Sequence, residues 1–587
     1  MPKEDQLSLP LPPRISSSYR RLRSRVKQRI AETIRSLTPH LSYSNWIKHC
    51  ERPSYQPARI TQAIAAFHYM PKVSIVMPVY NTPVVLLDLA ISSVRAQHYE
   101  NWELCICDDA SPKLAVRARL EHWSKQDPRI TVTHSTENEG ISRASNRALQ
   151  LASGEFVGLL DHDDELSQDA LYEVVKLLQD FPHADMIYSD EDKLDPHGRR
   201  IEPYFKPDWS PEYLLSMMYT LHFSVYRRCL LDEIGGFRAG FEGSQDYDLA
   251  LRITEKTDRI CHIPKILYHW RMAPGSAAAS SEAKPYAYDA AKRALTEHLS
   301  HKRIPGEILH GKWRGLYRVR FNLSEAERVS IVVPNLGKED DLKTCVRSIE
   351  DKSSYHNHEI VVVANRSIDA DTERYLSAHS CRLIFVGESR NFSRLVNIGA
   401  ANAQGQYLLI LHDDIEVISP DWMAAMLGFF SQERIGAVGV KLLYRTDRLQ
   451  HIGIVLGLKG LAGYPLQGRR GRPLGYPDPS DFIRNCSAVS GACMMVRKSV
   501  FEAVGGFDEQ LPGAYSDIDF CLRIREAGYR IVWTPHAELY HDEPPSRVDL
   551  SSSEAKYFIG RWPNILKNDP YYNPNLTLRY EDVGFRV

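Results

Sequence analysis

Long apolar runs and helical patterns alternate along this chain. Residues 73–77 form a continuous, largely β-branched run that stops at Pro78, and an apolar run without alternation predicts a strand buried on both faces. Strands that alternate with helices predict right-handed βαβ units and an α/β fold with a mostly parallel, doubly wound sheet. Further strands are predicted at residues 102–107, 130–133 and 154–160, and helices at residues 84–97 and 142–152.

The chain repeats this pattern. Offsets of 256, 251, 270 and 272 residues separate four blocks that recur in the same order: 73–78 as 329–334, 154–164 as 405–414, 234–237 as 504–507, and 267–269 as 539–541. Offsets this similar indicate one unit duplicated in tandem, and the period is far too long for a solenoid repeat. Each copy is therefore predicted to be a whole domain, and what survives in both copies is predicted to be the working part.

The repeat sets the predicted domain boundaries. We expect an N-terminal extension over residues 1–70, a first α/β domain over residues 71–310 and a second over residues 326–587. The hydrophobic content of 43% and the charged content of 25% are ordinary for globular domains with buried cores. In such sheets ligands collect at the carboxyl ends of the strands, so the functional residues are expected there.

The N-terminal extension carries a basic segment. Residues 20–30 place Leu22, Val26 and Ile30 at four-residue spacing among arginines and lysines, which predicts an amphipathic helix. A basic amphipathic helix can lie on an anionic membrane surface. The alternative is a solvated helix whose thin apolar stripe packs on the first domain.

Composition narrows the classes of function. A net charge of −1 argues against nucleic acid binding by bulk electrostatics. No apolar run approaches the ~18 residues that span a bilayer, and the N-terminus lacks the charged and then apolar pattern of a secretory signal. The 10 cysteines contain no Cys-x-x-Cys pair, so neither a zinc site nor a disulfide framework is indicated. These features predict a cytoplasmic protein with reduced thiols.

Acidic side chains close the same predicted strand in both copies. Asp161, Asp163 and Asp164 follow it in the first copy, and Asp413 and Asp414 follow it in the second. Clustered carboxylates repel one another unless a cation neutralises them, and hard oxygen ligands suit Mg²⁺ or Mn²⁺. The alternative is that Asp164 or a nearby serine caps the next helix. Recurrence in both copies favours the metal site.

Two further side chains fit a nucleotide diphosphate. Asp109 ends the neighbouring strand, where a carboxylate can accept a hydrogen bond from a nucleobase N–H, and the alternative is an Asx turn. Arg143 starts the helix before the acidic strand, and a guanidinium there can bind a diphosphate in a bidentate manner. Arg394 matches Arg143 in the second copy, and Asn397 matches Asn146.

A second pair of carboxylates recurs further along each copy. Asp246 and Asp248 precede Leu-Arg in the first copy, and Asp517 and Asp519 do so at the same spacing in the second. Capping of a helix N-terminus explains one carboxylate in each pair. Two in each copy, ahead of an amphipathic helix, fit a positioned general base better.

A histidine closes each copy in the sequence Leu-Tyr-His. These residues are His269 and His541. A single histidine of this kind is usually structural. One that is kept twice fits a metal or diphosphate ligand.

The ordered set of motifs resembles the family 2 inverting glycosyltransferases of the GT-A fold. The resemblance covers about residues 71–275 and 328–545. The second half, with Val489-Ser-Gly-Ala-Cys-Met-Met495, is similar to bacterial enzymes that build O-antigen and other surface polysaccharides, including rhamnosyltransferases. The motifs of the first copy are Pro-Val-Tyr80, Cys107-Asp-Asp109, Arg143, Asp161-x-Asp163, Gly243-Ser-Gln-Asp246 and Leu-Tyr-His269.

The resemblance implies a role for each matching residue. The fold would be two tandem GT-A domains, Rossmann-like, that transfer sugars with inversion from UDP-, dTDP- or GDP-linked donors to a glycan or lipid-linked glycan. Asp246 and Asp517 would be the general bases, and Asp163, His269, Asp414 and His541 would hold Mn²⁺ or Mg²⁺. The donor nucleotide and its diphosphate would contact Pro78, Tyr80, Asp109, Arg143 and Asp161 in the first copy, and Pro334, Asn365, Arg394 and Asp413 in the second.

This chain also departs from the pattern of the resemblance. The acidic residue usual before the base is Gln245 in the first copy and Ser516 in the second. In the second copy Asn365 stands at the position of Asp109 and Leu336 at that of Tyr80, and the acidic motif begins with His412. The nucleobase contacts of the second copy are therefore expected to differ.

Three interpretations compete. In the first, both halves transfer sugars, as a bifunctional enzyme or a polymerase of alternating linkages, at the inner face of a membrane. In the second, only residues 71–275 catalyse and the other half binds the acceptor or acts as a scaffold. In the third, the domains are sugar nucleotidyltransferases, but neither copy has the Gly-rich basic loop that binds a triphosphate. Motif retention favours the first interpretation.

Overall fold

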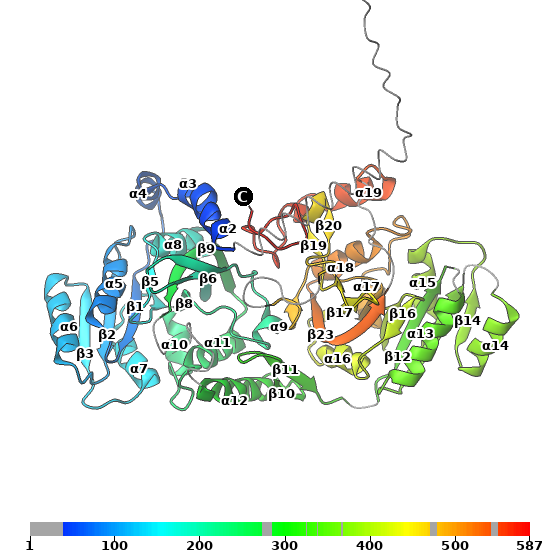
Figure 1. Cartoon of the computed structure of the whole chain (residues 1–587), viewed down its shortest axis with the longest axis horizontal. Coiled ribbons are helices and arrows are strands. Elements are labelled where there is room, and N and C mark those ends of the chain that lie inside the picture. Colours follow the sequence, from blue (N-terminus) through cyan, green and yellow to red (C-terminus); the bar gives the residue numbers. More distant parts are fainter. Residues whose placement is uncertain are drawn as a thin grey trace, which may run out of the picture.

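The computed structural model describes residues 39–272, 285–323, 326–336, 339–364, 368–469, 478–541 and 550–586. Figure 1 shows two α/β units side by side, each built on a twisted sheet. The basic segment at residues 20–30 and the predicted contact residue Asn365 lie outside the described residues.

The first unit contains a nine-stranded sheet with the order β3-β2-β1-β4-β8-β6-β9-β5, and β7 pairs with β6. Neighbours from β3 to β4 are parallel, as are β6 and β9, while β8 is antiparallel to β4 and β6. The strands are β1 (Val73–Val79), β2 (Trp102–Asp108), β3 (Ile130–His134), β4 (Phe156–Leu159), β5 (Glu165–Leu166), β6 (Met186–Leu194), β7 (Arg200–Tyr204), β8 (Ser224–Arg227) and β9 (Ile260–Arg271).

Helices cover both faces of this sheet, and a set of N-terminal helices lies over one end of it (Figure 1). The helices within the unit are α5 (Val84–Arg95), α6 (Leu114–Gln126), α7 (Ile141–Leu151), α8 (Ala170–Asp180), α9 (Pro211–Leu214), α10 (Arg228–Ile234) and α11 (Gln245–Lys256). The N-terminal elements are α2 (Pro39–Trp46), the π-helical turn η1 (Ile47–Glu51), α3 (Arg52–Ser54) and α4 (Pro57–Ala65).

The second unit repeats the arrangement in a ten-stranded sheet, β14-β13-β12-β15-β22-β17-β23-β16, with β18 and β21 at its side. The antiparallel strand β22 takes the place of β8. The strands are β12 (Val329–Asn335), β13 (His358–Ala364), β14 (Arg382–Phe385), β15 (Tyr407–Leu411), β16 (Ile415–Val417), β17 (Ile435–Leu443), β18 (Leu449–His451), β21 (Arg484–Asn485), β22 (Cys493–Arg497) and β23 (Arg530–His541). A separate two-stranded sheet joins β19 (Val455–Leu456) and β20 (Ala462–Gly463).

The helices of the second unit follow the same order. They are α13 (Glu339–Lys352), α14 (Ala370–Ala378), α15 (Phe392–Asn402), α16 (Trp422–Leu427), α17 (Lys498–Ala503), α18 (Ser516–Glu526) and α19 (Ser553–Arg561), with 3-10 turns η2 (Gly428–Ser431), η3 (Leu458–Gly460) and η4 (Ile565–Lys567).

The strands and helices predicted for the first unit are confirmed within one or two residues of their ends. Every residue of β1 and of its counterpart β12 is buried, as an unbroken apolar run requires. The antiparallel strands β8 and β22 were not predicted. They follow irregular segments, and nothing in their short apolar patterns sets their direction.

Recurring residues explain why the first strand is built alike in both units. The Ser74 hydroxyl accepts a hydrogen bond from the Gly154 N–H at 2.9 Å and donates to Glu103 at 2.6 Å. In the second unit Ser330, Gly405 and Glu359 make the same contacts at 2.8 and 2.5 Å. A Cβ on either glycine would lie 2.5–2.6 Å from a backbone carbonyl oxygen. The glycine before the acidic strand is therefore required by packing.

The Gly-Gly-Phe motif is held by an asparagine. Gly235 and Gly236 both have positive φ, which favours glycine. The Asn146 amide donates to the Phe237 carbonyl and accepts from the Phe237 N–H, both at 2.8 Å. Asn397 makes the equivalent pair of contacts with Phe507. The matched asparagines therefore fix a turn.

A helix and a hairpin connect the two units along one edge (Figure 1). Helix α12 (Pro285–His301) precedes a hairpin of β10 (Gly306–His310) and β11 (Tyr317–Phe321). Arg318 of β11 pairs with Asp421 of the second unit at 2.5 Å, and Phe321 packs edge-on against Phe429 with ring centroids 4.8 Å apart. The hairpin thus contacts the second unit.

Buried polar contacts also join the two units directly. Glu212 of α9 is 1% exposed and pairs with Arg530 at 2.7 Å and with the Asn485 amide at 2.6 Å. Beside it, Tyr213 stacks on Phe482 with centroids 4.3 Å apart. The interface therefore contains a buried ion pair. Removing either partner would leave the other charge buried without compensation, which is strongly destabilising.

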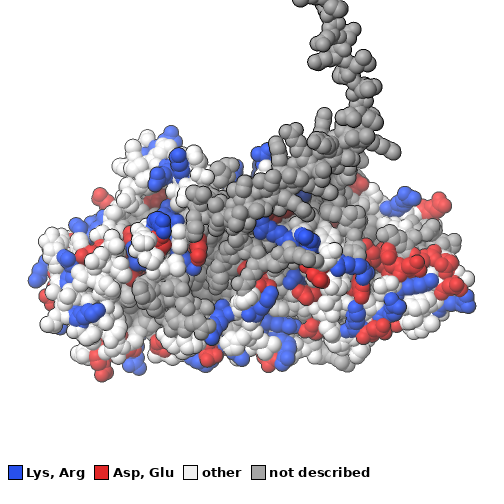
Figure 2. All heavy atoms as spheres, viewed as in Figure 1, with Lys and Arg blue, Asp and Glu red and all other residues white. Residues whose placement is uncertain are grey.

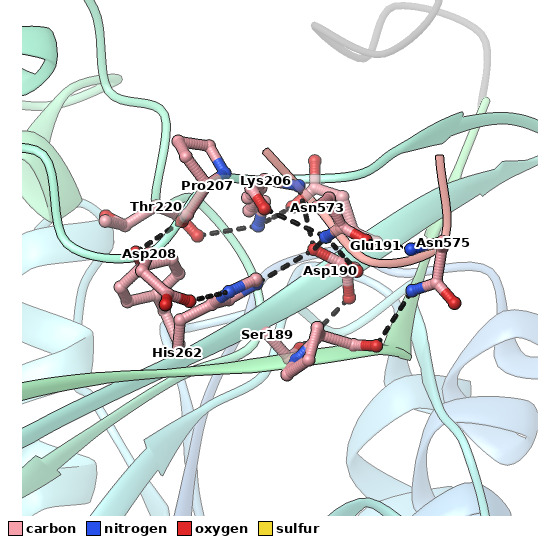
Figure 3. Close-up of polar contacts among 12 residues, drawn as sticks. Ser189, Asp190, Glu191, Lys206, Pro207, Asp208, Thr220, His262, Asn573 and Asn575 are labelled. Carbon is pink, nitrogen blue, oxygen red and sulfur yellow. Dashed lines mark hydrogen bonds and ion pairs between the residues drawn. The ribbon is translucent and has the colours of Figure 1, made fainter. Parts of the chain in front are cut away.

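The C-terminal residues extend this interface. Asp569 accepts from the Ser487 hydroxyl and the Leu456 N–H within the second unit. Four residues later, Asn573 donates to Asp190 of β6 (Figure 3). Asn575 donates to the Pro264 carbonyl. A short segment therefore binds both units.

Charge is mixed on the surface shown in Figure 2. Basic and acidic side chains are interspersed over this face, with acidic ones gathered near the outer end of the second unit. The first turn of α13 in this unit holds three acidic residues, Glu339, Asp340 and Asp341. Of the helices in the described part of the chain, none is long and apolar enough to cross a membrane.

Candidate functional site

The acidic turn of the first unit lies where β4 ends, as predicted. The Asp164 N–H donates to the Asp161 carbonyl at 3.3 Å, which closes the turn. Asp164 is 1% exposed, and its carboxylate accepts from the Tyr268 hydroxyl at 2.6 Å and from the Arg271 N–H at 2.7 Å. Burial, with Asp161 and Asp163 nearby, raises the pKa of Asp164 well above its ordinary value. Asp164 therefore anchors the turn, and Asp161 and Asp163 are its less buried carboxylates.

Asp246 lies at the start of α11 and faces the same turn. It is half-buried, and its carboxylate accepts from the Tyr247 N–H at 2.8 Å. Burial raises the pKa of Asp246, the charge of Asp161 adds to the rise, and His222 opposes it. A carboxylate with a raised pKa beside an acidic strand end is suited to accept a proton.

His222 was missed by the sequence reasoning. Its ring stacks on Tyr268 with centroids 4.5 Å apart. Burial acts to lower the pKa of His222, but Glu191, Asp161 and Asp164 outweigh it and raise the pKa to about 9. The first site therefore contains a protonated imidazole among its carboxylates at neutral pH.

A buried ion pair lies behind His222. Lys206 is fully buried, and its Nζ donates to Glu191 at 2.9 Å, to the Thr220 carbonyl at 2.7 Å and to the His222 carbonyl at 2.5 Å. Burial acts to raise the pKa of Glu191, but Lys206 and His222 lower it to about 2. No sequence motif marked these residues, because partners in such a pair are brought together only by the fold.

The second carboxylate of each helix-start pair is structural. Asp248 is 1% exposed and accepts from Arg238 at 3.1 Å and from Arg252 at 2.9 Å. Asp519 is fully buried and accepts from Arg523 at 2.8 Å and from the Trp562 indole at 3.0 Å. The recurring Leu-Arg is thus explained by an ion pair four residues along the helix, which leaves Asp246 and Asp517 as the base candidates.

The residues predicted to bind the nucleotide lie in or just after β1 and β2 and at the start of α7. The Asp109 carboxylate accepts from the N–H groups of Glu139 and Gly140, at 3.0 and 2.8 Å, and so fixes the loop before α7. Arg143 has 60% of its side chain exposed and lies 3.7 Å from Glu139. Pro78 is buried in β1, and Tyr80 just after it is 47% exposed. Their donor contacts stay predictions.

His269 points away from the acidic turn. Its Nδ1 lies 2.6 Å from Asp192, which is fully buried and also accepts from the Tyr43 hydroxyl and from Arg200, both at 2.5 Å. Among the residues that the structure describes, His269 and Asp163 do not belong to a convergent group of three metal-ligating side chains. A metal role for either residue stays a prediction.

The two Leu-Tyr-His motifs differ in register. Two residues separate Pro264 from Leu267 in β9, whereas three separate Pro535 from Leu539 in β23. Asp192 of β6 therefore lies opposite His269, and Tyr540 takes the equivalent place opposite Leu443 of β17. Because side chains alternate along a strand, His541 points to the opposite side from His269.

The acidic turn of the second unit is richer in nitrogen ligands. His412, Asp414 and His541 converge so that one ligand atom from each lies within 4.8 Å of the others, and they form the only such group in the described ranges. The His541 Nε2 lies 3.2 Å from Asp414. His412 was not among the predicted ligands, although its place at the first position of the acidic motif could have indicated it.

The pKa values of the three polar residues of this turn, His412, Asp413 and Asp414, are shifted in different directions. Burial raises the pKa of Asp413 to about 6, and Asp414 adds to the rise. Burial also acts to raise the pKa of Asp414, but its contact with His541 outweighs this and lowers the pKa. Burial lowers the pKa of His412 to about 4. Asp413 itself accepts from the Asn335 amide at 2.8 Å.

The remaining predicted residues of the second unit lie around this turn. Asp517 starts the recurring helix and accepts from the Gly491 N–H at 2.9 Å, and the next residue, Ala492, accepts from the His412 N–H at 3.0 Å. Pro334 is buried in β12. Arg394 is exposed on α15, where its N–H donates to the capping side chain of Asn391.

Each unit thus places strand-end carboxylates near a helix-start aspartate on the same α/β topology. Residues 74–235 and 330–505 each match the domain described as Glycosyl transferase family 2. The two matches cover more than half of the chain, so the chain belongs to glycosyl transferase family 2 and carries two such domains in tandem. The predicted α/β fold with two tandem GT-A domains is confirmed.

Individual proteins are similar over most of this chain. The uncharacterized protein y4gI of Sinorhizobium fredii (strain NBRC 101917 / NGR234) is 41% identical over 543 residues, 89% of this chain and 60% of that protein. The O-antigen biosynthesis protein RfbC of Myxococcus xanthus is 36% identical over 547 residues, 90% of this chain and 42% of that protein. This chain thus spans less than two thirds of the length of either relative.

One solved structure extends the comparison. S. aureus TarS 1–349 in complex with UDP aligns with a TM-score of 0.31 and 20% identity, covering 39% of this chain and 65% of that one.

Proposed function

We propose that both units are active, inverting glycosyltransferases that move sugars from nucleotide-diphosphate donors to a growing bacterial surface polysaccharide. One observation carries the proposal: each unit sets a helix-start aspartate, Asp246 or Asp517, against the turn at the end of the acidic strand. Their domains are residues 71–310 and 326–587. The printed name of the Myxococcus relative supports a polysaccharide product.

The base in each unit is the helix-start aspartate. Asp246 takes the proton from an acceptor hydroxyl, whose oxygen then forms a bond to the anomeric carbon. The bond from that carbon to the donor diphosphate breaks, the nucleoside diphosphate leaves, and the configuration inverts. Burial supports this role, because it raises the pKa of Asp246 and makes it a better proton acceptor than a solvated carboxylate.

A divalent ion, Mn²⁺ or Mg²⁺, belongs to the proposal. When bound, it neutralises the leaving diphosphate. In the first unit Asp163 would hold it with Asp161 close by, and His269 would join them only if the end of β9 rotated its side chain from Asp192 toward the acidic turn. In the second unit Asp414 and His541 would hold it, and their 3.2 Å separation supports that pairing.

The donor is a UDP-, dTDP- or GDP-linked sugar. Asp109 would receive the nucleobase, with Tyr80 packing on it above Pro78, and Arg143 would face the diphosphate. At the matching sequence positions the second unit has Pro334, Asn365 and Arg394, and its acidic motif adds Asp413. Leu336 is 47% exposed where the first unit has Tyr80, so the second unit is proposed to differ in nucleotide preference or affinity.

The acceptor is proposed to be a lipid-linked glycan, and the enzyme to work in the cytoplasm at the inner face of the membrane. Basic residues of segment 20–35 would contribute about 1 kcal/mol each near an anionic surface. Deleting residues 1–38 should therefore release the protein from anionic vesicles, as should high salt. Equal sedimentation with vesicles of the full chain and the deletion would contradict this.

A second candidate function is that only the first unit transfers sugar and the second binds the acceptor. The altered nucleobase positions of the second unit favour it. Asp163→Ala and Asp414→Ala decide between the two, each assayed with a panel of nucleotide sugars and a lipid-linked acceptor. If each variant lacks a different linkage, both units are active. If Asp414→Ala gives unchanged product at an unchanged rate, the second unit is a binding module.

A further inference from the structure

The second unit brings two imidazoles and one carboxylate to a single point. His412 and Asp414 come from the turn after β15, and His541 comes from the end of β23. Their ligand atoms lie within 4.8 Å of one another. The two imidazole rings meet edge-on with centroids 5.2 Å apart, and Phe392 also packs edge-on against His412, with centroids 5.1 Å apart. The three side chains are thus held in place before any ligand binds.

Gln450 orients His541 from behind. The Gln450 Nε2 donates to the His541 carbonyl at 3.0 Å, and a carbonyl can only accept. The amide oxygen is therefore the atom that faces the His541 Nδ1 at 2.8 Å, so Nδ1 carries the hydrogen. The other nitrogen, Nε2, is then directed at Asp414. Metal-binding histidines usually donate their second N–H to an oxygen in this way.

The His541–Asp414 contact needs a cation or a proton. A neutral imidazole with its hydrogen on Nδ1 presents a lone pair at Nε2, and the Asp414 carboxylate presents another at 3.2 Å. Two acceptors at that distance repel unless a positive charge lies between or beside them. His412 adds a third ligand atom to the same place.

The first unit differs at the same positions. Counting from the matched glycines Gly154 and Gly405, Asp161 stands at the place of His412 and Asp163 at that of Asp414. Both turns close alike, through the N–H of the residue three positions after Asp161 or His412. The first turn therefore offers oxygen ligands, which suit Mg²⁺, whereas imidazole nitrogen suits first-row transition ions.

We propose that His412, Asp414 and His541 form a two-histidine, one-carboxylate site that selects a borderline transition ion such as Co²⁺ or Zn²⁺ over Mg²⁺. The inference rests on the proposed metal role of Asp414 and His541, and adds His412 and the ion preference. Three protein ligands leave coordination positions open for oxygens of a donor diphosphate. The two units then bind different ions.

Metal binding tests this without an activity assay. The full chain carrying Asp163→Asn, which weakens the first site, is titrated with Co²⁺ while the visible absorption bands of the bound ion are recorded. We expect one Co²⁺ per chain with nitrogen-ligand bands, bound at least 100-fold more tightly than Mg²⁺ in competition. His412→Ala should weaken Co²⁺ binding at least tenfold. Gln450→Met should weaken it roughly 10–100-fold, through loss of the orienting contact.

His412→Asp is the sharpest variant, because it restores the ligand type of the first unit. It should lower the preference for Co²⁺ over Mg²⁺ by at least tenfold and remove the bands that report nitrogen ligands. His356→Gln is the matched control, since it removes an exposed histidine of the same unit and should change nothing. Near-ultraviolet circular dichroism establishes that each variant is folded.

Two results would overturn the inference. If Co²⁺ does not bind, His541 and Asp414 form an imidazolium–carboxylate pair and no metal site. If His412→Ala binds Co²⁺ as tightly as the parent chain, His412 is not a ligand. Failure of the proposed function is seen separately: Co²⁺ binding to a second unit that transfers no sugar leaves the metal site intact and removes only the catalytic role.

Discussion

Asn573 donates hydrogen bonds of 2.9 and 3.1 Å to the two carboxylate oxygens of Asp190, which lies 383 residues earlier in the chain. The same carboxylate accepts from the Lys206 N–H at 2.8 Å and lies 2.9 Å from His262 (Figure 3). Asp190 precedes Glu191, which pairs with Lys206 and His222 beside the first acidic turn. The C-terminal segment of the second unit therefore supports β6, whose Glu191 contacts His222 beside the first acidic turn.

Replacing Asn573 should destabilise the whole chain. Asn573→Ala removes donors to a fully buried carboxylate, and such a loss costs about 1–3 kcal/mol. Asn573→Asp should cost more, because it places a second negative charge beside Asp190. Urea denaturation measures the free energy of unfolding.

Asn575→Ala is the control for that experiment, because its side chain donates to the neutral Pro264 carbonyl at 2.9 Å. Its cost should be about 0.5–1.5 kcal/mol. Equal losses for Asn573→Ala and Asn575→Ala would mean that the contact with Asp190 carries no special weight.

The pH profile of the first unit should reflect Asp246. Burial raises its pKa, and a general base must be ionised to work. Transfer should therefore fall, as pH decreases, at a pH above the value of ~4 typical of a free carboxyl group. The measurement is kcat/KM against pH in an Asp414→Ala background, where only the first unit acts.

His222→Gln sharpens this prediction. His222 lowers the pKa of Asp246 by its positive charge, so its removal should move the acid limb to still higher pH. His183→Gln, which changes an exposed histidine of the same unit, should leave the limb in place. A limb that moves to lower pH in His222→Gln would exclude Asp246 as the titrating base.

His222 should also make stability depend on pH. Its pKa rises to about 9 in the folded chain, above the value of ~6.5 expected when unfolded. A raised pKa stabilises the fold fully below pH ~6.5, and this contribution is lost as the pH rises to about 9. The gap in unfolding free energy between the parent chain and His222→Gln should shrink by on the order of 2–3 kcal/mol across that window. A gap that is constant with pH would mean that His222 is neutral in the fold.

Asp163 and Asp180 separate metal dependence from general charge effects. Asp163→Asn removes one ligand charge at the acidic turn while keeping its shape, so transfer by the first unit should fall by orders of magnitude with an unchanged Tm. Asp180→Asn, an exposed change at the end of α8, should affect neither. Transfer that persists in EDTA or in Asp163→Asn would refute the metal assignment.

The sheet strands and the acidic turn could be predicted because each is specified by a short run of consecutive residues. Packing of neighbouring strands requires the buried run of β1 and the matched glycines Gly154 and Gly405. Because both copies have this requirement, the same residues recur and can be recognised in the sequence. The metal role predicted for the acidic turn rests on the carboxylates that recur in both copies of that turn.

Features that depend on distant contacts could not be predicted. Glu191, Lys206 and His222 come from three separate segments and share no motif. The single extra residue before Leu539 makes His541 point to the opposite side of its strand from His269. Both motifs read Leu-Tyr-His, so the motif alone does not show this difference. Asp246 and Asp248 both recur in the second copy, so the sequence did not distinguish them. The ion pairs of Asp248 with Arg238 and Arg252 give it a structural role.

Asp246 and Asp248 therefore give opposite results when each is changed to asparagine. Asp246→Asn should leave donor binding and Tm near those of the parent chain while transfer collapses, because only proton removal is lost. Asp248→Asn leaves Arg252 and Arg238 beside a neutral amide, and breaking a buried pair by removing one partner costs ~3–5 kcal/mol. Donor affinity by calorimetry, transfer rate and Tm are measured on both variants. An Asp246→Asn chain that loses donor affinity and transfer equally would make Asp246 a binding residue, and the base would have to lie elsewhere.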